Sequence, residues 1–341
     1  MTLRACIVGG GGIANAHAKA ASSVDEVELE AICDVSEEAA KHFAREYIIP
    51  NSYGDLEMML ATEAPFDLAT ICTWGNSHAE LAIKLARSGK VKAILCEKPI
   101  CLTAVECAEM VDVTRSEGVI LAEAFKFRHH PMHLRAKQLI NDGAIGELRS
   151  LRSTFMTGVN REAIRPEMNW RFDPERGGGA TYDLGCYCIH HARFMFGMEP
   201  TSVFAVGDFH ELCGIDFQVA ATLGFPGGAS AQLSYGFGLG GGSQEAQMVG
   251  TVGRIITDVA WNNEGRPTGI EGRFGGGEEA KFRFQPVDQF ALQLRHMVDV
   301  LEGRTEHRIP ALNSLKQMRV MDAVQESMRS GEVVNLDQED D

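Results

Sequence analysis

Four consecutive glycines near the N-terminus constrain the fold of this chain more than any other feature. The apolar run Leu3–Val8 ends directly at Gly9-Gly10-Gly11-Gly12, and a helical pattern of alanines follows from Ala14. A short apolar strand, a glycine-rich turn and a helix in this order are typical of the first unit of a doubly wound α/β sheet. In such a turn Gly9 permits the tight bend, Gly11 lets another group approach the backbone, and Ala14 lets helix and strand pack closely.

The first third of the chain alternates apolar strands with helical segments. Capping boxes at Ser77–Glu80 and Thr103–Glu106 predict where two of the helices begin. This alternation favours a parallel sheet that helices cover on both faces. The expected strands are Leu3–Val8, Val27–Cys33, Phe66–Cys72, Val91–Cys96 and Val119–Ala122.

From about residue 147 the pattern changes to strands that follow one another with glycine-rich turns between them. This succession predicts a large, mostly antiparallel open sheet. We therefore expect an α/β chain with an N-terminal Rossmann domain over residues 1–123 and a second α/β domain over residues 124–311. The expected strands of the second domain are Leu148–Met156, Val203–Phe209, Phe217–Phe225 and Ser230–Tyr235, and the expected helices are Tyr182–Phe196, Gln289–Leu301 and Ser314–Met328.

Charge and hydropathy exclude several classes of function. The 341 residues include 32 Lys and Arg against 47 Asp and Glu, a net charge of −15. A field of this sign repels phosphate backbones, and no apolar run reaches the roughly 18 residues of a membrane span. The N-terminal apolar stretch is too short for a signal peptide. We expect a cytoplasmic protein without nucleic-acid or membrane partners, whose nine cysteines are reduced packing residues and which holds no metal.

An acidic residue follows the glycine-rich turn at the distance typical of dinucleotide-binding folds. Asp34 comes directly after the strand Val27–Cys33. Its carboxylate can accept hydrogen bonds from the adenosine ribose and would repel a 2′-phosphate. The sequence therefore predicts a bound NAD, with NADP as a less favoured possibility. The alternative interpretation is a tight turn beside an aspartate that caps a helix.

Two strand ends carry polar side chains that can bind a ligand or assist proton transfer. Cys96-Glu97-Lys98-Pro99 ends a strand at the carboxyl edge of the sheet, where parallel sheets bind ligands, and Thr73–His78 reaches the same edge. Lys98 can donate a hydrogen bond to a substrate hydroxyl and assist its proton transfer. The alternatives are a lysine that caps the strand at the surface and a solvated His78 in the first turn of a helix.

A third segment, Gly177–Tyr187, carries a carboxylate and a phenol. Asp183 and Tyr187 are four residues apart, so they share one face of a helix. Together they can act as an acid–base pair. A buried tyrosine beside a capping aspartate is the alternative, which the spacing does not reject.

The order of these segments resembles that of the Gfo/Idh/MocA oxidoreductase family. Tyr187 stands where inositol-dehydrogenase-like members carry histidine, which resembles the branch of glucose–fructose oxidoreductase and the dihydrodiol dehydrogenases. The resemblance covers nearly the whole chain. The segments that carry it are Val8–Ala14, Asn76–Glu80, Glu97–Pro99, Phe127–Pro131 and Gly177–Tyr187.

The resemblance implies an NAD(P)-dependent dehydrogenase. Its reaction would be hydride transfer between nicotinamide and a secondary hydroxyl or ketone of a sugar, polyol or sugar derivative. It also implies a homodimer or homotetramer joined through the open sheet, a Lys98–Pro99 bond that is often cis, and a last helix, about 312–329, that can return to the first domain.

The same resemblance assigns roles to individual residues. Lys98, Tyr187 and Asp183 are the expected catalytic residues, with Tyr187 as the base, Lys98 lowering its pKa and Asp183 orienting the substrate. Expected cofactor contacts are Gly9, Gly11, Gly12, Ile13, Ala14, Asp34, Thr73, Asn76, His78, Glu97 and Lys98. Expected substrate contacts are Lys98, Arg128, Arg165, Trp170, Arg171, Asp183 and Tyr187. Arg171 is alternatively a structural anchor of its loop, and any part taken by His190 or His191 stays open.

Two other functions are compatible with the same motifs. One is a redox-assisted glycoside-cleaving enzyme, in which NAD transiently oxidises the sugar and is regenerated. The other is a non-catalytic sensor that binds NAD as a regulatory ligand, which the presence of both Lys98 and Tyr187 disfavours. No pattern in the sequence identifies the substrate.

Overall fold

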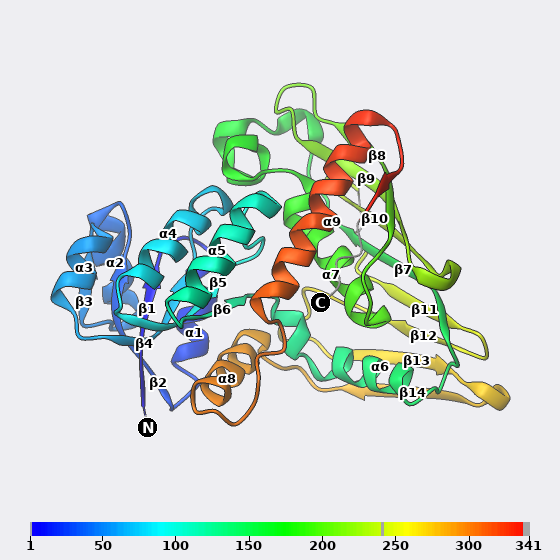
Figure 1. Cartoon of the computed structure of the whole chain (residues 1–341), viewed down its shortest axis with the longest axis horizontal. Helices are drawn as coiled ribbons and strands as arrows, with labels where there is room; N and C mark the ends of the chain where they lie inside the picture. The colour runs from blue at the N-terminus through cyan, green and yellow to red at the C-terminus, as the bar shows by residue number, and fades with distance from the viewer. Residues whose placement is uncertain (1, 240–241, 337–341) are drawn as a thin grey trace. The chain divides into compact units, whose positions relative to one another are not determined.

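The computed structural model describes residues 2–239 and 242–336, and the chain divides into two compact units. Unit 1 consists of the residues up to His129 together with Asp288–Leu315. Unit 2 consists of His130–Val287 together with the described residues from Lys316 on. Each unit is built on its own β-sheet (Figure 1). The expected α/β class is confirmed.

Unit 1 contains a six-stranded parallel sheet in the order β3-β2-β1-β4-β5-β6. The chain proceeds outward from β1 in one direction and then from β4 in the other, so the switch point lies between these two strands. The predicted Rossmann sheet is confirmed. Its strands are β1 (Leu3–Val8), β2 (Val27–Cys33), β3 (Asn51–Tyr53), β4 (Phe66–Ile71), β5 (Val91–Cys96) and β6 (Ile120–Glu123).

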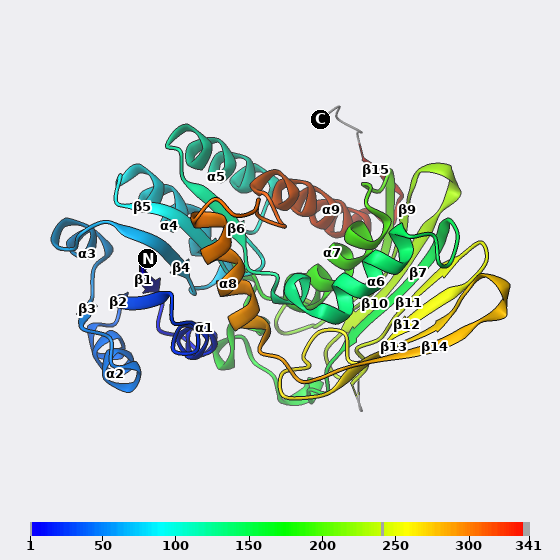
Figure 2. The ribbon, with the colours of Figure 1, turned by 90° about the horizontal axis from the view of Figure 1, so that it is seen from below.

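Helices cover both faces of this sheet, with α1 and α8 on one side and α4 and α5 on the other (Figure 2). The helices of unit 1 are α1 (Ala14–Ala21), α2 (Glu37–Tyr47), α3 (Leu56–Thr62), α4 (Gly75–Arg87), α5 (Ala104–Ser116) and α8 (Gln289–Leu301). Although α8 lies far along the chain, its buried Phe290, Leu294 and Met297 share a core cluster with β1, β4 and β5. The domain boundaries predicted from the sequence place α8 in the second domain. Helical spacing indicates an apolar face but does not show which part of the protein packs against it.

The two predicted capping boxes had different outcomes. At α5 the prediction is confirmed, since the Thr103 side chain accepts from the backbone of Glu106 and the Glu106 side chain accepts from that of Thr103. At α4 it is wrong, because the helix already begins at Gly75 with Trp74 as its N-cap. Ser77 lies inside the first turn, where its hydroxyl donates to Thr73 Oγ1 at 2.8 Å.

Unit 2 contains a nine-stranded sheet in the order β14-β13-β12-β11-β7-β10-β9-β8-β15. All neighbouring strands are antiparallel except β7 and β10, which confirms the large, mostly antiparallel sheet. The strands are β7 (Leu148–Met156), β8 (Ser202–Phe209), β9 (Asp216–Gly224), β10 (Ser230–Gly236), β11 (Ala246–Gly250), β12 (Arg254–Thr257), β13 (Thr268–Arg273), β14 (Glu279–Phe284) and β15 (Val334–Asn335).

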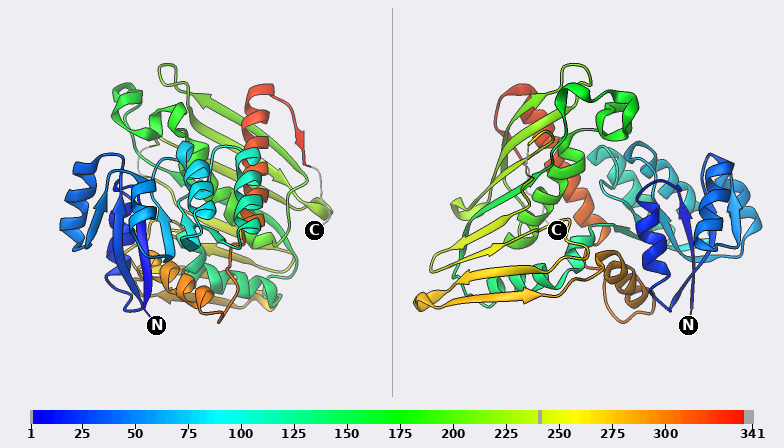
Figure 3. Two further views of the ribbon diagram at one scale, coloured as in Figure 1. Left: turned by 60° about the vertical axis from the view of Figure 1, so that its left-hand side comes forward. Right: turned by 180° about the vertical axis from the view of Figure 1, so that it is seen from behind.

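Helices line one face of this large sheet (Figure 3). Two of them, α6 (Pro131–Asn141) and α7 (Cys186–Phe196), contact β13 and β7 respectively. The last helix, α9 (Ala311–Ser330), belongs to unit 2 from Lys316 on. There Gln317 Nε2 donates to the Cys186 carbonyl at 3.0 Å and Ser327 Oγ accepts from the Ala205 N–H at 2.9 Å. Among the described residues, no helix is both long and apolar enough to cross a membrane.

The helix expected over Tyr182–Phe196 is divided. Thr181–Gly185 forms a single π-helical turn, and α7 follows it. A π turn holds more residues than an α turn, so the four-residue spacing of Asp183 and Tyr187 does not describe one regular α-helical face. Close packing accompanies the turn, because a Cβ on Gly185 would lie 2.5 Å from Tyr235 Cζ.

The glycine-rich turn between β1 and α1 packs directly on the end of β4. Gly9 has φ of +96°, and a Cβ there would lie 2.7 Å from Thr73 Cγ2 and 2.9 Å from the carbonyl carbon of Cys72. Gly12 differs, because no atom lies within 4 Å of a Cβ built on it. The turn therefore requires glycine at its first position but not, for folding, at its fourth.

Gly9→Ala should lower the free energy of unfolding by about 1–3 kcal/mol, because it adds a strained φ and a backbone clash. Gly12→Ala is the matched control and should change it by less than about 0.5 kcal/mol. Urea denaturation of the nucleotide-free protein measures both values. Equal midpoints for the two variants would contradict the packing of the turn.

Two buried histidines, His129 and His296, and the half-buried His307 gather in unit 1 where the 3-10 helix Lys126–His129, α8 and the following loop meet. The rings of His129 and His296 lie 5.0 Å apart, and those of His296 and His307 lie 5.1 Å apart. Arg308 donates from Nη1 to His129 Nδ1 at 2.8 Å and from its backbone to His296 Nε2 at 3.1 Å. Burial and the nearby Arg308 lower the pKa of both His296 and His307 to about 4.

This cluster should make unit 1 sensitive to acid. Between about pH 6.5 and 4 the unfolded chain binds protons that the folded His296 and His307 do not, so the free energy of unfolding falls as the pH falls. His307→Gln should reduce the slope of that decline, whereas His42→Gln, on the exposed face of α2, should not. Denaturation at several pH values measures the slope, and equal slopes for His307→Gln and the unmodified protein would refute the prediction.

Candidate active site

The carboxyl edge of the sheet in unit 1 presents an open helix N-terminus. Gly11 and Gly12 are exposed, and the nearest atom to a Cβ on Gly11 is the Cys72 carbonyl oxygen at 3.9 Å. The N–H groups of Ala14 and Ala16 donate to the carbonyls of Gly11 and Ile13 in the turn, and the N-terminus of α1 carries the positive end of the helix dipole. This arrangement fits a pyrophosphate, which such turns bind through backbone N–H groups.

Asp34 is held in place by the turn itself. Its Oδ2 accepts from the Gly10 N–H at 2.8 Å, and its Oδ1 accepts from the Ser36 N–H at 2.8 Å. Each carboxylate oxygen keeps a further lone pair for a ligand hydroxyl. The half-buried Asp34 therefore lies beside the open N-terminus of α1 in an orientation that fits a ribose diol. The next residue, Val35, is fully exposed.

A buried ion pair fixes the backbone at Lys98. His17 Nε2 on α1 donates to Glu97 Oε1 at 2.7 Å, and Glu97 Oε2 accepts from the Lys98 N–H at 3.1 Å. Burial would raise the pKa of Glu97, but the hydrogen bond and charge of His17 hold it below its usual value. Glu97 is among the site residues expected from the sequence, whereas His17 is not. The only feature of the sequence that could have indicated it is the presence of a histidine among the small residues of α1.

His78 anchors the same edge from the first turn of α4. Only 1% of the residue is exposed, so the solvated alternative is wrong. Its ring nitrogens lie 2.9 Å from the Pro99 carbonyl oxygen and 3.1 Å from that of Thr73. Burial lowers the pKa of His78, and its ring lies between the end of β4 and the segment after Lys98. The Lys98–Pro99 bond is cis, and Asn76 is exposed.

Arg128, an expected substrate contact, is buried in unit 1. Its Nη2 donates to the carbonyl of Arg308 at 3.1 Å, which links the 3-10 helix Lys126–His129 to the loop after α8. This contact gives Arg128 a structural role, and substrate binding by it stays a prediction.

Within unit 2, the structure brings three expected residues together. Arg171 Nε donates to Asp183 Oδ2 at 2.7 Å, and the Arg171 guanidinium lies 4.7 Å from the centre of the Trp170 ring. The side chain of Asp183 is 7% exposed and that of Arg171 is 40% exposed. Arg165 is not part of this group, because it is exposed and donates to the carbonyls of Glu162 and Ile164.

Tyr187 lies on α7 in an aromatic cluster. Its ring packs edge-on against Phe155 at 5.4 Å and at an angle against Trp261 at 5.8 Å. Trp261 is fully buried, and its Nε1 donates to the Thr154 carbonyl at 2.9 Å. His191 lies edge-on to the same indole at 5.2 Å. Trp261 is not among the site residues expected from the sequence, because it lies in a segment without hydrophobic periodicity.

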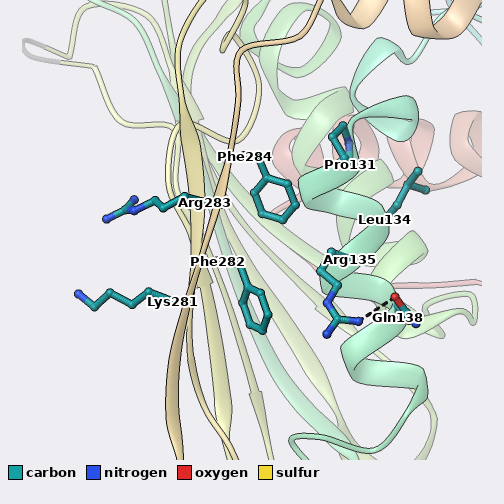
Figure 4. Close-up of a pocket in the computed structure, with 8 residues that line it drawn as sticks. All are labelled: Pro131, Leu134, Arg135, Gln138, Lys281, Phe282, Arg283 and Phe284. Atoms are coloured by element: carbon teal, nitrogen blue, oxygen red, sulfur yellow. Dashed lines mark hydrogen bonds between the residues drawn. The ribbon is translucent and has the colours of Figure 1, made fainter.

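A hollow elsewhere in unit 2 contains none of the expected site residues. It lies between α6 and β14, where Phe282 and Phe284 point toward the helix while Lys281 and Arg283 point away (Figure 4). The guanidinium of Arg135 lies 5.1 Å from the centre of the Phe282 ring and donates to Gln138 Oε1 at 2.9 Å.

The described residues also show how the cysteines and possible metal ligands are arranged. All nine cysteines are free and buried. Within residues 2–239 and 242–336, no three His, Cys, Asp or Glu side chains are grouped so that they could hold a metal ion.

Comparisons with known proteins agree with this architecture. Residues 3–125 match the model of the oxidoreductase family with an NAD-binding Rossmann fold, and residues 133–256 match that of the GFO/IDH/MocA C-terminal domain. The chain is 30% identical to D-xylose 1-dehydrogenase (NADP(+)) 2 of Haloferax volcanii over 331 residues, 97% of this chain and 99% of that protein.

Two further relatives show the same pattern. Trans-1,2-dihydrobenzene-1,2-diol dehydrogenase of Mus musculus is 35% identical over 237 residues, 69% of this chain and 68% of that protein. The crystal structure of aldose–aldose oxidoreductase from Caulobacter crescentus superposes with a TM-score of 0.88 at 25% identity, covering 98% of this chain and 100% of that one. The chain therefore belongs to the Gfo/Idh/MocA family of oxidoreductases, as its motifs indicated.

Proposed function

We propose that this chain is an NAD(P)-dependent dehydrogenase acting on a secondary hydroxyl or ketone of a sugar, polyol or sugar derivative. The observation that carries the proposal is the open N-terminus of α1 beside Asp34, at the switch point of the unit 1 sheet. The names of its relatives, which include a D-xylose dehydrogenase and an aldose–aldose oxidoreductase, support a carbohydrate substrate.

The proposed cofactor contacts follow from the geometry of unit 1. The Gly9–Gly12 turn and the N-terminus of α1 would hold the pyrophosphate, and Asp34 would hold the adenosine ribose. Thr73, with its hydroxyl bound by Ser77, would line the same edge. NAD(P), when bound, supplies the acceptor or donor of the hydride.

The proposed proton chemistry belongs to three side chains. Tyr187 would take the proton of the substrate hydroxyl during oxidation, and Lys98 would favour the phenolate by its positive charge. Arg171 Nε donates to Asp183 Oδ2 at 2.7 Å, which fixes the orientation of this carboxylate. Asp183 would then accept a hydrogen bond from a substrate hydroxyl. A tyrosine near its ordinary pKa of about 10 is a poor base at neutral pH, so the proposal gives Lys98 an essential part.

A reduction screen tests the main proposal. Purified protein with NAD or NADP should produce the reduced cofactor continuously with at least one member of a panel of aldoses, inositols, glycosides and sugar acids. Consumption of a glycoside without net NADH would instead support redox-assisted cleavage. Cofactor binding without turnover of any panel member would support a sensor.

One prediction of the proposed function concerns the choice between NAD and NADP. We expect NAD to bind more tightly than NADP, because the Asp34 carboxylate repels a 2′-phosphate. Asp34→Ser combined with Val35→Arg should reverse the preference, since the exposed position 35 would then offer a phosphate partner. Titration of NADH and NADPH fluorescence measures both dissociation constants. Tighter NADPH binding by the unmodified protein, in line with the NADP-dependent relative, would contradict the role of Asp34.

The second prediction concerns Lys98 and Tyr187 as one catalytic unit. Lys98→Met and Tyr187→Phe should each lower kcat by on the order of 10²–10⁴-fold, the usual scale of acid–base catalysis. The double variant should fall little further than either single one, because each group acts through the other. NADH affinity should change much less than kcat.

Lys92→Met, at an exposed lysine of β5, is the control and should retain full turnover. Near-normal turnover of Tyr187→Phe with a confirmed substrate would make Tyr187 a packing residue of its aromatic cluster. The base would then be sought at Asp183, His190 or His191.

The third prediction concerns assembly through the nine-stranded sheet. On β8 the exposed Phe204 and Val206 alternate with the buried Val203 and Ala205, so one face of this strand carries apolar side chains. We propose that a second copy covers this face in a homodimer or homotetramer. Light scattering at micromolar concentration should give a multiple of 37.2 kDa, and Val206→Glu should lower it. A monomeric mass for the unmodified protein would refute the proposal.

A further inference from the structure

A buried carboxylate outside the expected site residues lies against the π turn that carries Asp183. Asp216 is the first residue of β9 and is only 3% exposed. Its Oδ2 accepts from the Thr181 N–H at 2.6 Å and from the Thr181 hydroxyl at 2.6 Å. Thr181 begins the π turn and is fully buried. Asp216 therefore holds the start of this turn through both its backbone and its side chain.

The hydroxyl of Tyr235 extends the same network. It lies 3.2 Å from Thr181 Oγ1, and since the single hydroxyl hydrogen of Thr181 points to Asp216, Tyr235 is the donor in this contact. The Tyr235 ring also lies where a Cβ on Gly185 would be, at the end of the turn. Both ends of the π turn are thus packed against one hydrogen-bonded chain of side chains.

Gly179, before the turn, lets the Asp216 carboxylate approach the backbone closely. A Cβ on Gly179, which has φ of +119°, would lie 2.1 Å from Asp216 Oδ1. The Gly179 N–H donates to the Arg171 carbonyl at 2.9 Å, and its own carbonyl accepts from the Asp183 N–H at 3.1 Å. One residue in contact with Asp216 is therefore bonded to the backbones of both partners of the Arg171–Asp183 ion pair.

Both hydrogen bonds from Thr181 end on the same carboxylate oxygen of Asp216, Oδ2. They occupy its two lone-pair positions. Loss of the side chain at position 216 would therefore leave two buried donors of Thr181 unsatisfied, at a cost that would fall on the turn.

We propose that Asp216 is a positioning residue for the dehydrogenase reaction, holding the π turn so that Asp183 and Tyr187 keep the geometry the reaction requires. The inference depends on the proposed function of Asp183 and Tyr187. Asp216 acts through Thr181 and Gly179 and does not contact the reacting atoms. A π turn is less regular than an α turn and often marks a functional segment, so support from outside the helix is expected.

The titration of Asp216 provides a signature. Burial raises the pKa of Asp216 to about 6, although the hydrogen bonds from Thr181 oppose the rise. The titratable groups next in this network are Tyr235 on β10 and, facing Tyr235, Cys186 and Cys188 on α7. Protonation of the carboxyl removes an acceptor position and weakens its hold on Thr181.

Kinetic variants test the positioning role. Asp216→Ala and Thr181→Val should lower kcat by about 10- to 100-fold, since small misplacements of reacting groups have effects of this size. The dissociation constant for NADH should change less than about twofold, because the expected cofactor contacts belong to unit 1. Thr181→Ser keeps the hydroxyl and should restore most of kcat. Glu211→Gln, an exposed carboxylate in the connection between β8 and β9, is the matched control.

The pH profile separates positioning from general destabilisation. In the unmodified protein kcat should fall as the pH drops below about 6, the pKa of Asp216. Thr181→Val should move this decline to higher pH, because it removes a hydrogen bond that lowers the pKa, and Asp216→Ala should abolish the Asp216 contribution. A kcat within about twofold of the unmodified enzyme in both variants, or an unmoved profile, would overturn the proposal.

A measurement without substrate distinguishes this inference from the proposed function. Amide hydrogen exchange over residues 178–187 should become at least about tenfold faster in Asp216→Ala, while β1 and β4 keep their protection. Unchanged exchange in this segment would overturn the inference even if the enzyme is active. Absence of turnover by the unmodified protein across the whole panel would count against the proposed function, and the exchange result would then decide only whether Asp216 holds the turn.

Discussion

The close approach of Gly9 to the end of β4 is the constraint on which the architecture of unit 1 depends. Because no side chain fits between Gly9 and the atoms of Cys72 and Thr73, the first turn lies directly over the neighbouring strand. This contact sets where α1 begins, and Gly10 then offers its N–H to Asp34 at the end of β2. One steric requirement thus brings three strand ends to the place where a dinucleotide is expected to bind.

Buried carboxylates hold the functional segments of the two units by different electrostatics. Glu97 receives a hydrogen bond from His17 and lies beside Lys98, so positive neighbours keep its pKa low in spite of burial. Asp216 accepts hydrogen bonds from the neutral N–H and hydroxyl of Thr181, so burial prevails and its pKa rises. The lowered pKa keeps the Glu97 carboxylate charged to a lower pH than usual, whereas the π turn is held most firmly above about pH 6.

Much of the fold could be predicted from local signals. The strands β1, β2, β5 and β7 and the helix α8 have the expected bounds, because apolar runs and capping residues mark them directly. The short β3 and α3 were missed, since the intermediate burial of Asn51–Tyr53 leaves no apolar pattern. Tertiary contacts decide to which unit α8 belongs and why Thr181–Gly185 forms a π turn. The spacing of residues along the chain does not encode such contacts.

The candidate site, like the fold, contains some residues that local sequence patterns indicate and others that they do not. The Gly9–Gly12 turn, Asp34 and Lys98 could be found because each follows a recognisable strand. The supporting groups His17, Trp261 and Asp216 could not, because each acts through a residue distant in sequence. Roles of this kind follow from burial and hydrogen bonding, and a sequence shows neither.

The loop between β7 and the π turn links substrate contact to the proposed chemistry. It contains several short 3-10 turns, and some of its polar side chains bind neighbouring backbone, as Arg165 does. Arg171 is different, because its side chain binds Asp183 while its carbonyl binds Gly179. A substrate that displaced the Arg171 side chain would therefore act directly on Asp183. For this reason a change at Arg171 should alter turnover and substrate affinity together, whereas the hydrogen bonds of Arg165 link it to the backbone of its own loop and not to Asp183.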